Sequence, residues 1–99
     1  MAGASDVEIT NNTDANRYEA HLDGKLAGFA EYLLSNGLIT FSHTETDPAF
    51  QGRGVGSALA KAALDDVRAN HTDRKVLPLC PFIRAWIRRH PEYADLVFA

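Results

Sequence analysis

A glycine-rich turn near the middle of the chain has the composition of an anion-binding site. The segment Gln51-Gly52-Arg53-Gly54-Val55-Gly56-Ser57 lies between a strand-like segment and a helix-like one. Its glycines allow close approach of the backbone to a ligand, and the first turn of a helix leaves N–H groups without partners. These amides and the helix dipole would stabilise a phosphate or pyrophosphate. We therefore predict anion binding at residues 51–57, with the Arg53 guanidinium as a further candidate contact.

The spacing of the glycines excludes two familiar phosphate-binding motifs. In the dinucleotide-binding fingerprint, the third glycine follows the second by three residues. Three residues after Gly54 stands Ser57, and three residues after Gly56 stands Leu59. The nucleotide-triphosphate P-loop ends in Gly-Lys followed by Ser or Thr, and no glycine of this turn precedes a lysine. The turn therefore belongs to a different class of phosphate site.

The segments before the turn predict four antiparallel strands. Alternating apolar and polar residues, separated by turn-forming residues, place these strands at residues 7–11, 17–22, 25–34 and 38–46. Asp23-Gly24 predicts a tight hairpin, because both residue types tolerate positive φ. The third strand has apolar residues at both odd and even positions, so apolar side chains point to both faces of the sheet. We therefore expect this strand to be central and covered on both faces. One face of the fourth strand is expected to carry Ile39, Phe41, His43 and Glu45.

After the turn the apolar residues follow helical spacing. At about 100° per residue, one side of a helix over residues 54–70 collects Val55, Leu59, Ala62, Ala63 and Val67. Asp66 also falls on this apolar side. It is a misfit there unless its place near the helix end lets it reach water.

A short strand and a second helix complete the predicted fold. Residues 76–79 form an apolar run typical of a buried strand, and Pro81 suits the first position of a helix that Pro91 ends. The apolar stripe of this helix is expected to pack in the core and consists of Phe82, Ile83, Trp86 and Ile87. Its basic edge, expected to be mainly solvated, consists of Arg84, Arg88 and Arg89.

Composition limits the classes of function. The 99 residues, 45% of them hydrophobic, suit one α/β domain over residues 1–99 with a single core. A net charge of -3 argues against a nucleic-acid partner. The four histidines are far apart and have no nearby cysteine, so we predict no metal.

Cysteine usage and hydropathy favour a cytoplasmic protein. Cys80 is the only cysteine, which excludes an internal disulfide and weakens the case for a secreted scaffold. No basic region followed by an apolar stretch opens the chain, and no run approaches the roughly 18 to 20 apolar residues that cross a bilayer. We therefore expect a soluble protein without a membrane partner.

The turn resembles the signature of the GNAT acetyltransferase superfamily, which is Gln or Arg, two free positions, Gly, one free position, then Gly or Ala. Gln51, Gly54 and Gly56 match it. The resemblance extends over about residues 7–90 and implies a GNAT-like, mainly antiparallel mixed sheet of about five strands with two helices. It further implies that residues 51–57 hold the pyrophosphate of acetyl-CoA, while pantetheine lies where the fourth and fifth strands separate.

Two shorter segments narrow the resemblance. Cys80-Pro81-Phe82 and His90-Pro91-Glu92-Tyr93 are similar to segments of small, single-domain GNAT-like proteins. A usual member has two helices between its first two strands that wall the acceptor site, whereas only residues 12–16 are available here. The last strand pair of the family is also expected to be missing, because few residues follow Pro91.

Three residues are candidates for the acyl transfer that the resemblance implies. Glu45 lies on the strand that borders the thioester in GNAT enzymes, and it could accept a proton from an attacking amine. His43 lies about 6 to 7 Å away along the strand and could assist or replace it. Cys80 precedes the second helix, whose dipole favours a thiolate, and could carry the acetyl group. The structural alternatives are an exposed carboxylate, a structural histidine and a buried packing cysteine.

The sequence therefore predicts transfer of an acetyl group from acetyl-CoA to a primary amine. A protein or peptide is a candidate acceptor, because an open groove would admit one more readily than a closed pocket. The alternative is a CoA-binding or acyl-sensing module with little or no catalysis. A nucleic-acid-binding domain that uses the arginines of the last helix is a third hypothesis, which the acidic charge balance disfavours.

Overall fold

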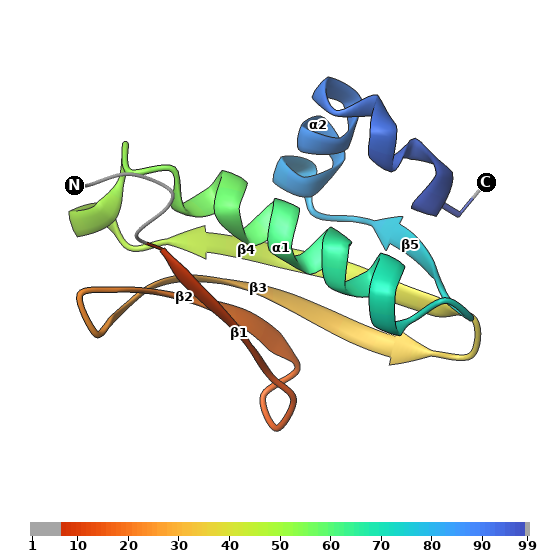
Figure 1. The fold of residues 1–99 in the computed structure, drawn as a ribbon, viewed down its shortest axis with the longest axis horizontal. Coiled ribbons are helices and arrows are strands. Elements are labelled where there is room, and N and C mark those ends of the chain that lie inside the picture. Colours follow the sequence, from red (N-terminus) through yellow and green to blue (C-terminus); the bar gives the residue numbers. More distant parts are fainter. Residues whose placement is uncertain (1–6, 99) are drawn as a thin grey trace.

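A single five-stranded sheet organises the protein, in a computed structural model that describes residues 7–98 (Figure 1). The strands lie in sequence order and are β1 (Glu8–Asn12), β2 (Arg17–Leu22), β3 (Lys25–Ser35), β4 (Leu38–Thr46) and β5 (Lys75–Pro78). The first four are antiparallel, and β5 runs parallel to β4. The helices are the short 3-10 helix η2 (Pro48–Phe50), α1 (Val55–Asn70), α2 (Pro81–Arg89) and the 3-10 helix η3 (Pro91–Leu96). The predicted mixed, mainly antiparallel sheet with two α-helices is confirmed.

The turns follow the predicted residue chemistry. Asp23 and Gly24 have φ angles of 53° and 77°, so both central residues of the β2–β3 hairpin adopt positive φ as expected. Between β1 and β2 the chain makes only a turn, and no helix forms there. Beyond α2, η3 leads to one parallel bridge between Val76 and Val97. Within residues 7–98 no helix therefore lies between β1 and β2, as predicted.

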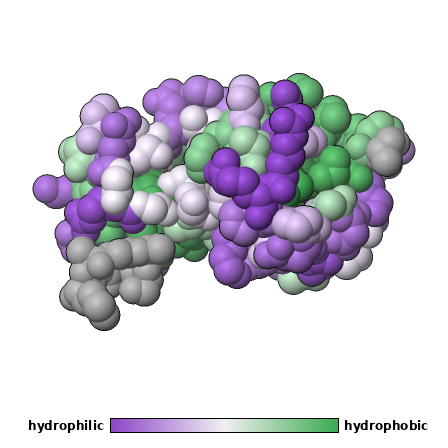
Figure 2. Space-filling model, turned by 90° about the horizontal axis from the view of Figure 1, so that it is seen from above, coloured by the Kyte–Doolittle hydropathy of each residue, from purple (hydrophilic) through white to green (hydrophobic). Residues whose placement is uncertain are grey.

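Helices α1 and α2 lie on the same side of the sheet (Figure 1). Beneath them lies one core, to which the sheet contributes Tyr18, Ala20, Leu22, Tyr32, Ile39 and Phe41 and α1 contributes Leu59, Ala63, Leu64 and Val67. We call the opposite side of the sheet the open face, because no described helix lies on it. Hydrophobic atoms on the surface gather toward the end that carries the C-terminus (Figure 2).

Strand β3 is central, but the prediction that both of its faces are covered was wrong. On the side away from the helices, Leu33 is 60% exposed and Leu26 is 40% exposed. Apolar residues at both parities indicated a strand between two layers. Both α-helices pack on one side instead, so some of the apolar side chains of β3 remain in contact with solvent.

A β-bulge interrupts strand β4. His43 lies opposite Glu31, whereas Phe41 lies opposite Tyr32, the next residue of β3. Ser42 is therefore an extra residue on β4 without a counterpart on β3. The alternation of side chains restarts after it.

The bulge overturns the predicted facing of the β4 side chains. Ile39 and Phe41 are completely buried under the helices. The side chains of His43 and Glu45 lie on the open face and retain 50% and 60% exposure. The prediction that Ile39, Phe41, His43 and Glu45 share one face was wrong. It assumed that side chains alternate without interruption along β4, whereas the extra residue Ser42 reverses the alternation.

Asp66, the misfit on the apolar side of α1, is held by protein donors. The buried Tyr18 hydroxyl donates to its carboxylate at 2.6 Å, and the Asn70 side chain donates at 2.5 Å. Burial, together with this hydrogen bond, raises the pKa of Tyr18 well above its usual range. The contact ties α1 to β2 and explains an acidic residue within an apolar arc.

Removal of this hydroxyl should weaken the fold. We expect Tyr18→Phe to lower the free energy of unfolding by about 1 to 2 kcal/mol, since the half-buried carboxylate of Asp66 loses a donor. Urea unfolding followed by circular dichroism measures the change. Tyr32→Phe is the matched control, because the Tyr32 hydroxyl donates to the exposed Asn11 side chain at 2.7 Å. A smaller loss for Tyr18→Phe than for Tyr32→Phe would contradict the assignment.

Candidate functional site

The glycine-rich turn forms the entry to helix α1. Gly52 and Gly54 have φ angles of 82° and 77°, a region that side chains other than glycine rarely adopt. Gly54 is the residue that precedes the helix, which begins at Val55. These two glycines let the chain reverse from η2 into α1 within a few residues.

The amides of this turn point away from protein acceptors. The Gln51 amide donates to the Pro48 carbonyl at 3.4 Å, and the Ala58 amide donates to the Gly54 carbonyl at 3.0 Å. Between these two, no oxygen of residues 7–98 accepts a hydrogen bond from the amides of Gly52 to Ser57. A consecutive run of unpartnered N–H groups at a helix N-terminus can hold an anion.

A hollow of about 300 Å³ lies over these amides. It is lined by Thr46, Phe50, Gln51, Gly52, Gly54, Val55, Gly56, Ser57 and Phe82. Six of the seven residues predicted to bind the cofactor thus surround one space. Arg53 does not line it, and its buried Nε has no hydrogen-bond partner in the described part of the chain.

Phe82 was predicted to be a core residue, and this was wrong. Its side chain is 37% exposed and lines the hollow, whereas Ile83 and Trp86 are buried as predicted. A Cβ atom added to Gly56 would lie 2.7 Å from the Phe82 ring. The third glycine of the turn therefore accommodates this ring, which brings the first turn of α2 against the first turn of α1.

Strands β4 and β5 separate beside this hollow. Their last pair joins Phe41 to Pro78, and the Cys80 amide then donates to the Phe41 carbonyl at 2.9 Å. Strand β4 continues to Thr46 without a partner on this side. Arg84, predicted to lie on a solvated basic edge, donates instead to the Pro78 carbonyl at 3.2 Å and to that of Leu79 at the same distance. It thereby holds the chain where β5 ends.

Cys80 lies at the point of separation. Its side chain is 3% exposed, and its Sγ lies 3.3 Å from the Thr44 hydroxyl oxygen across the gap. It is also the residue that precedes α2, which begins at Pro81. The thiol therefore lies between the first turn of α2 and the end of β4.

His43 and Glu45 form a second pair on the open face. Their side chains, expected to be about 6 to 7 Å apart by strand geometry, lie in contact, with 2.7 Å between His43 Nε2 and a Glu45 carboxylate oxygen. Thr44, the partner of Cys80, lies opposite the buried Ala30 and therefore on the helix side. The three predicted catalytic residues thus form two groups on opposite faces of β4, rather than one cluster.

Comparison with known proteins identifies this architecture. Residues 17–96 match the family model described as GCN5-related N-acetyl-transferase. The chain is a member of this family, GNAT. Protein NATD1 of Gallus gallus is 37% identical over 88 residues, which cover 86% of this chain and 77% of that protein. Protein NATD1 of Xenopus tropicalis is 28% identical over 94 residues, with coverages of 92% and 84%.

Solved structures share the GNAT fold. A GCN5-like protein from Staphylococcus aureus, determined in solution by NMR, has a TM-score of 0.69 and 24% identity. That comparison covers 96% of this chain and 91% of the other. A ribosomal-protein-alanine N-acetyltransferase from Brucella melitensis has a TM-score of 0.55 and 20% identity, covering 84% of this chain and 61% of the other. The predicted GNAT resemblance is confirmed for both family and fold.

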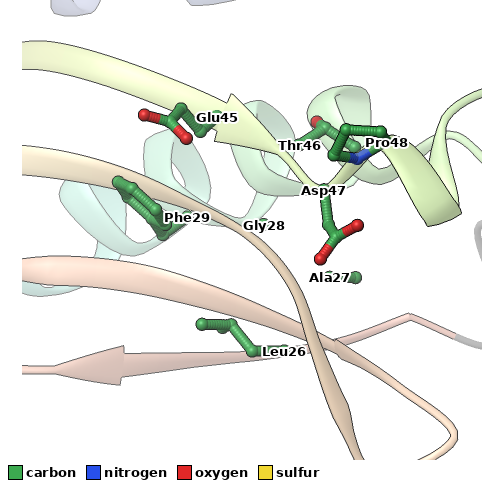
Figure 3. A pocket seen from close by; sticks show the side chains of 8 residues that line it. All are labelled: Leu26, Ala27, Gly28, Phe29, Glu45, Thr46, Asp47 and Pro48. Carbon is green, nitrogen blue, oxygen red and sulfur yellow. The ribbon is translucent and has the colours of Figure 1, made fainter.

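A second hollow, of about 200 Å³, opens where β3 begins and β4 ends (Figure 3). It is lined by Leu26, Ala27, Gly28, Phe29, Glu45, Thr46, Asp47 and Pro48. Glu45 and Phe29 lie opposite each other on β4 and β3, and the Asp47 carboxylate points toward Ala27 (Figure 3). Thr46 lines both this hollow and the one over the amides. Both spaces therefore lie at the end of β4.

Several residues of the site were missed by sequence reasoning. Thr44 and Thr46 were predicted only as residues of a strand, Asp47 was not singled out, and Phe82 was predicted to belong to an apolar helix stripe. The Cys80-Pro81-Phe82 resemblance was the one signal that pointed toward Phe82. Thr44, Thr46 and Asp47 line the site because of the separation of β4 from β5 and because of the bulge in β4, which the sequence did not indicate.

Within residues 7–98, no group of three or more His, Cys, Asp or Glu side chains is arranged to hold a metal ion. The described helices include none with the length and hydropathy needed to cross a bilayer.

Proposed function

We propose that this protein transfers the acetyl group of acetyl-CoA to a primary amine, including an amine on a protein or peptide. The observation that carries the proposal is the run of unpartnered amides from Gly52 to Ser57 at the start of α1. Pyrophosphate oxygens are strong acceptors, and several aligned N–H groups at a helix N-terminus would bind them. Membership of the GNAT family supports acetyl-CoA as the source of that pyrophosphate.

The remainder of the cofactor would follow the gap between β4 and β5. The unpaired edge of β4 beyond Phe41 offers backbone donors and acceptors to the amides of the pantetheine arm. The exposed Phe82 ring supplies an apolar wall beside the pyrophosphate amides. These features would leave the thioester near Cys80 and Thr44, where the gap begins.

In the direct mechanism, the acceptor nitrogen attacks the thioester carbonyl. A C–N bond forms, the C–S bond breaks, and the CoA thiol leaves with a proton. Glu45 would accept the proton from the amine, directly or through water, and its 2.7 Å contact with His43 would orient its carboxylate. Because both side chains face the open side of the sheet, the acceptor would approach from that side.

In a covalent variant, Cys80 would receive the acetyl group first. The Cys80 sulfur would attack the thioester carbonyl, the C–S bond to CoA would break, and the proton from the Cys80 thiol would leave on the CoA thiol. The amine would then attack the Cys80 thioester and regenerate the thiol. The position of Cys80 before the first turn of α2 and its contact with Thr44 favour this variant.

A CoA-binding or acyl-sensing module is the second candidate. The described residues form no helix over the open face, so no closed acceptor pocket surrounds Glu45, whose side chain is 60% exposed. A carboxylate in contact with bulk water is also typical of a surface residue without a catalytic role. A protein that only senses acyl-CoA would need the amides of the turn and would not need Glu45.

Acetyl-CoA titration combined with two single substitutions tests these proposals. We expect the unmodified chain to bind acetyl-CoA in calorimetry and Glu45→Gln to bind it equally well. Transfer to a peptide amine should fall about 100-fold in Glu45→Gln, because a general base is lost. Glu92→Gln is the control, since Glu92 is an exposed glutamate on η3.

Mass spectrometry after incubation with acetyl-CoA separates the two chemical routes. An acetyl adduct that is absent in Cys80→Ala, together with lost transfer, supports the covalent variant. Unchanged transfer in Cys80→Ala supports the direct mechanism. If acetyl-CoA binds and neither the unmodified chain nor either variant transfers the acetyl group, the binding-module function is correct and the enzymatic one is wrong.

We also propose that residues 1–99 act as one domain in the cytoplasm. One hydrophobic core contains residues from every strand from β2 to β5 and from both α-helices, and the only cysteine is a free thiol. A single cooperative unfolding transition and a cytoplasmic distribution of the tagged chain are the expected results.

A further inference from the structure

The open face of the sheet carries an excess of negative charge. The pairing of the strands places four glutamates on this side, namely Glu8, Glu19, Glu31 and Glu45. Two basic residues of the described strands share this side: Lys75 at its far edge on β5, which donates to the Asp95 carbonyl at 3.0 Å, and Arg17 on β2. Arg17 is the one that stands among the glutamates of β1 to β4. It is engaged with the Glu19 carboxylate at 2.7 Å, and its guanidinium lies 4.6 Å from the centre of the Phe29 ring. Acidic side chains therefore dominate the face.

Two of these glutamates have no cationic partner in residues 7–98. Glu8 and Glu31 take part in no salt bridge there, whereas the Glu45 carboxylate contacts His43. The pKa of Glu19 is lowered by hydrogen bonds from Asn12 and Arg17, so this carboxylate remains ionised. A face with this charge attracts a positively charged partner and repels an acidic one.

The hollow beside Glu45 has the chemistry of an alkylammonium site. Leu26, Phe29 and Pro48 offer apolar surface to a hydrocarbon stem, while Glu45 and Asp47 offer carboxylates to its charged end (Figure 3). One Asp47 oxygen accepts from the Ala49 amide at 2.9 Å, and the carboxylate keeps further acceptor capacity. A lysine side chain matches this combination.

The spacing of the acidic groups suits an extended chain. Glu31 lies opposite His43, and Glu45 follows two residues later on β4, so the two glutamates are diagonal neighbours. Such neighbours are about 7 to 8 Å apart. Side chains on one face of an extended peptide recur at about 6.5 to 7 Å. Two alternate basic residues could therefore contact Glu31 and Glu45 together.

We propose that the open face docks an extended, lysine- and arginine-containing peptide segment, with a lysine side chain in the hollow between Phe29 and Glu45. The proposal rests on the proposed acetyl transfer and gives the class of its acceptor. Thr46 lines both hollows, so a lysine held there lies at the same end of β4 as the amides assigned to the pyrophosphate.

Peptide binding in the absence of acetyl-CoA tests the docking surface directly. The probe is a fluorescein-labelled ten-residue peptide in which lysine or arginine alternates with serine, and its matched partner has glutamate at the basic positions. Anisotropy with the full chain should show binding of the basic peptide only, weakening as salt rises. We expect Glu31→Lys to reduce its affinity about tenfold and Glu92→Lys, on η3, to change it less than about twofold.

Three other results of these binding measurements would contradict the docking proposal. Equal effects of Glu31→Lys and Glu92→Lys, or equal binding of the acidic peptide, would overturn the proposal. Self-association of the chain that Glu31→Lys abolishes, without peptide binding, would assign the face to a second copy and also overturn it. Calorimetry with acetyl-CoA is independent of these results, because Glu31 lies outside the cofactor hollow. If acetyl-CoA does not bind, the proposed acetyl transfer is wrong, but the conclusion that the open face binds a basic peptide is unaffected.

Discussion

Gly52→Val is expected to lower the affinity for acetyl-CoA about 100-fold. Gly52 has a φ of 82°, which a β-branched residue does not tolerate, so the turn must leave its present conformation. The amides from Gly52 to Ser57 would then no longer face one space. Loss of two charge-assisted hydrogen bonds, at about 1.5 kcal/mol each, corresponds to this change in affinity. Titration calorimetry with acetyl-CoA measures it.

Gly37→Val is a matched control for this substitution. Gly37 has a φ of 77° and, like Gly52, would place a Cβ with no protein atom within 4 Å. It lies in the turn between β3 and β4, away from the residues that line the cofactor hollow. Both variants should lose similar stability, whereas only Gly52→Val should lose acetyl-CoA. Equal affinities in the two variants would show that the turn does not bind the pyrophosphate.

Gly28→Ala is expected to destabilise the fold by about 3 kcal/mol, a large fraction of the stability of a domain of this size. A Cβ at this position would lie 2.5 Å from the Glu45 carbonyl oxygen and 3.0 Å from a methyl group of Val55. The nearer atom belongs to the backbone of β4, so the two central strands must move apart. Urea unfolding measures the loss.

The effect of Gly28→Ala should extend to the site, because Gly28 and Glu45 both line the hollow at the end of β4. Gly24→Ala is the control, since its Cβ would meet no atom within 4 Å and only its φ of 77° opposes the change. This control should lose about 1 kcal/mol. An unfolding midpoint of Gly28→Ala equal to that of Gly24→Ala would mean that the strands accommodate the methyl group without separating.

The cofactor turn could be predicted from the sequence because its determinants are local. Glycine at positive φ and a following helical pattern together require unpartnered amides at the start of α1. The roles of Gly52 and Gly54 follow from these facts alone. The role of Gly56 does not follow from them. The Phe82 ring that occupies the space above Gly56 lies 26 residues further along the chain.

The candidate catalytic residues illustrate the opposite case. Their types and approximate positions were evident from the sequence, which offered Glu45, His43 and Cys80 as separate candidates without saying on which side of β4 each would lie. One extra residue, Ser42, turns Glu45 to the open face while Thr44 faces the Cys80 thiol. Whether a strand accommodates a bulge depends on its neighbours, so this information is absent from β4 itself.

The sequence by itself therefore determined the order of the elements, the hairpin at Asp23-Gly24, the amide-lined turn and the membership of a small GNAT class. These depend on backbone preferences and on patterns within a few residues. Only the tertiary structure decided that both α-helices share one side, that β3 has an open face, and that Glu45 and Cys80 lie on opposite sides of β4. These outcomes depend on packing between segments far apart in the chain, where side-chain volume and strand register, rather than local preference, set the free energy.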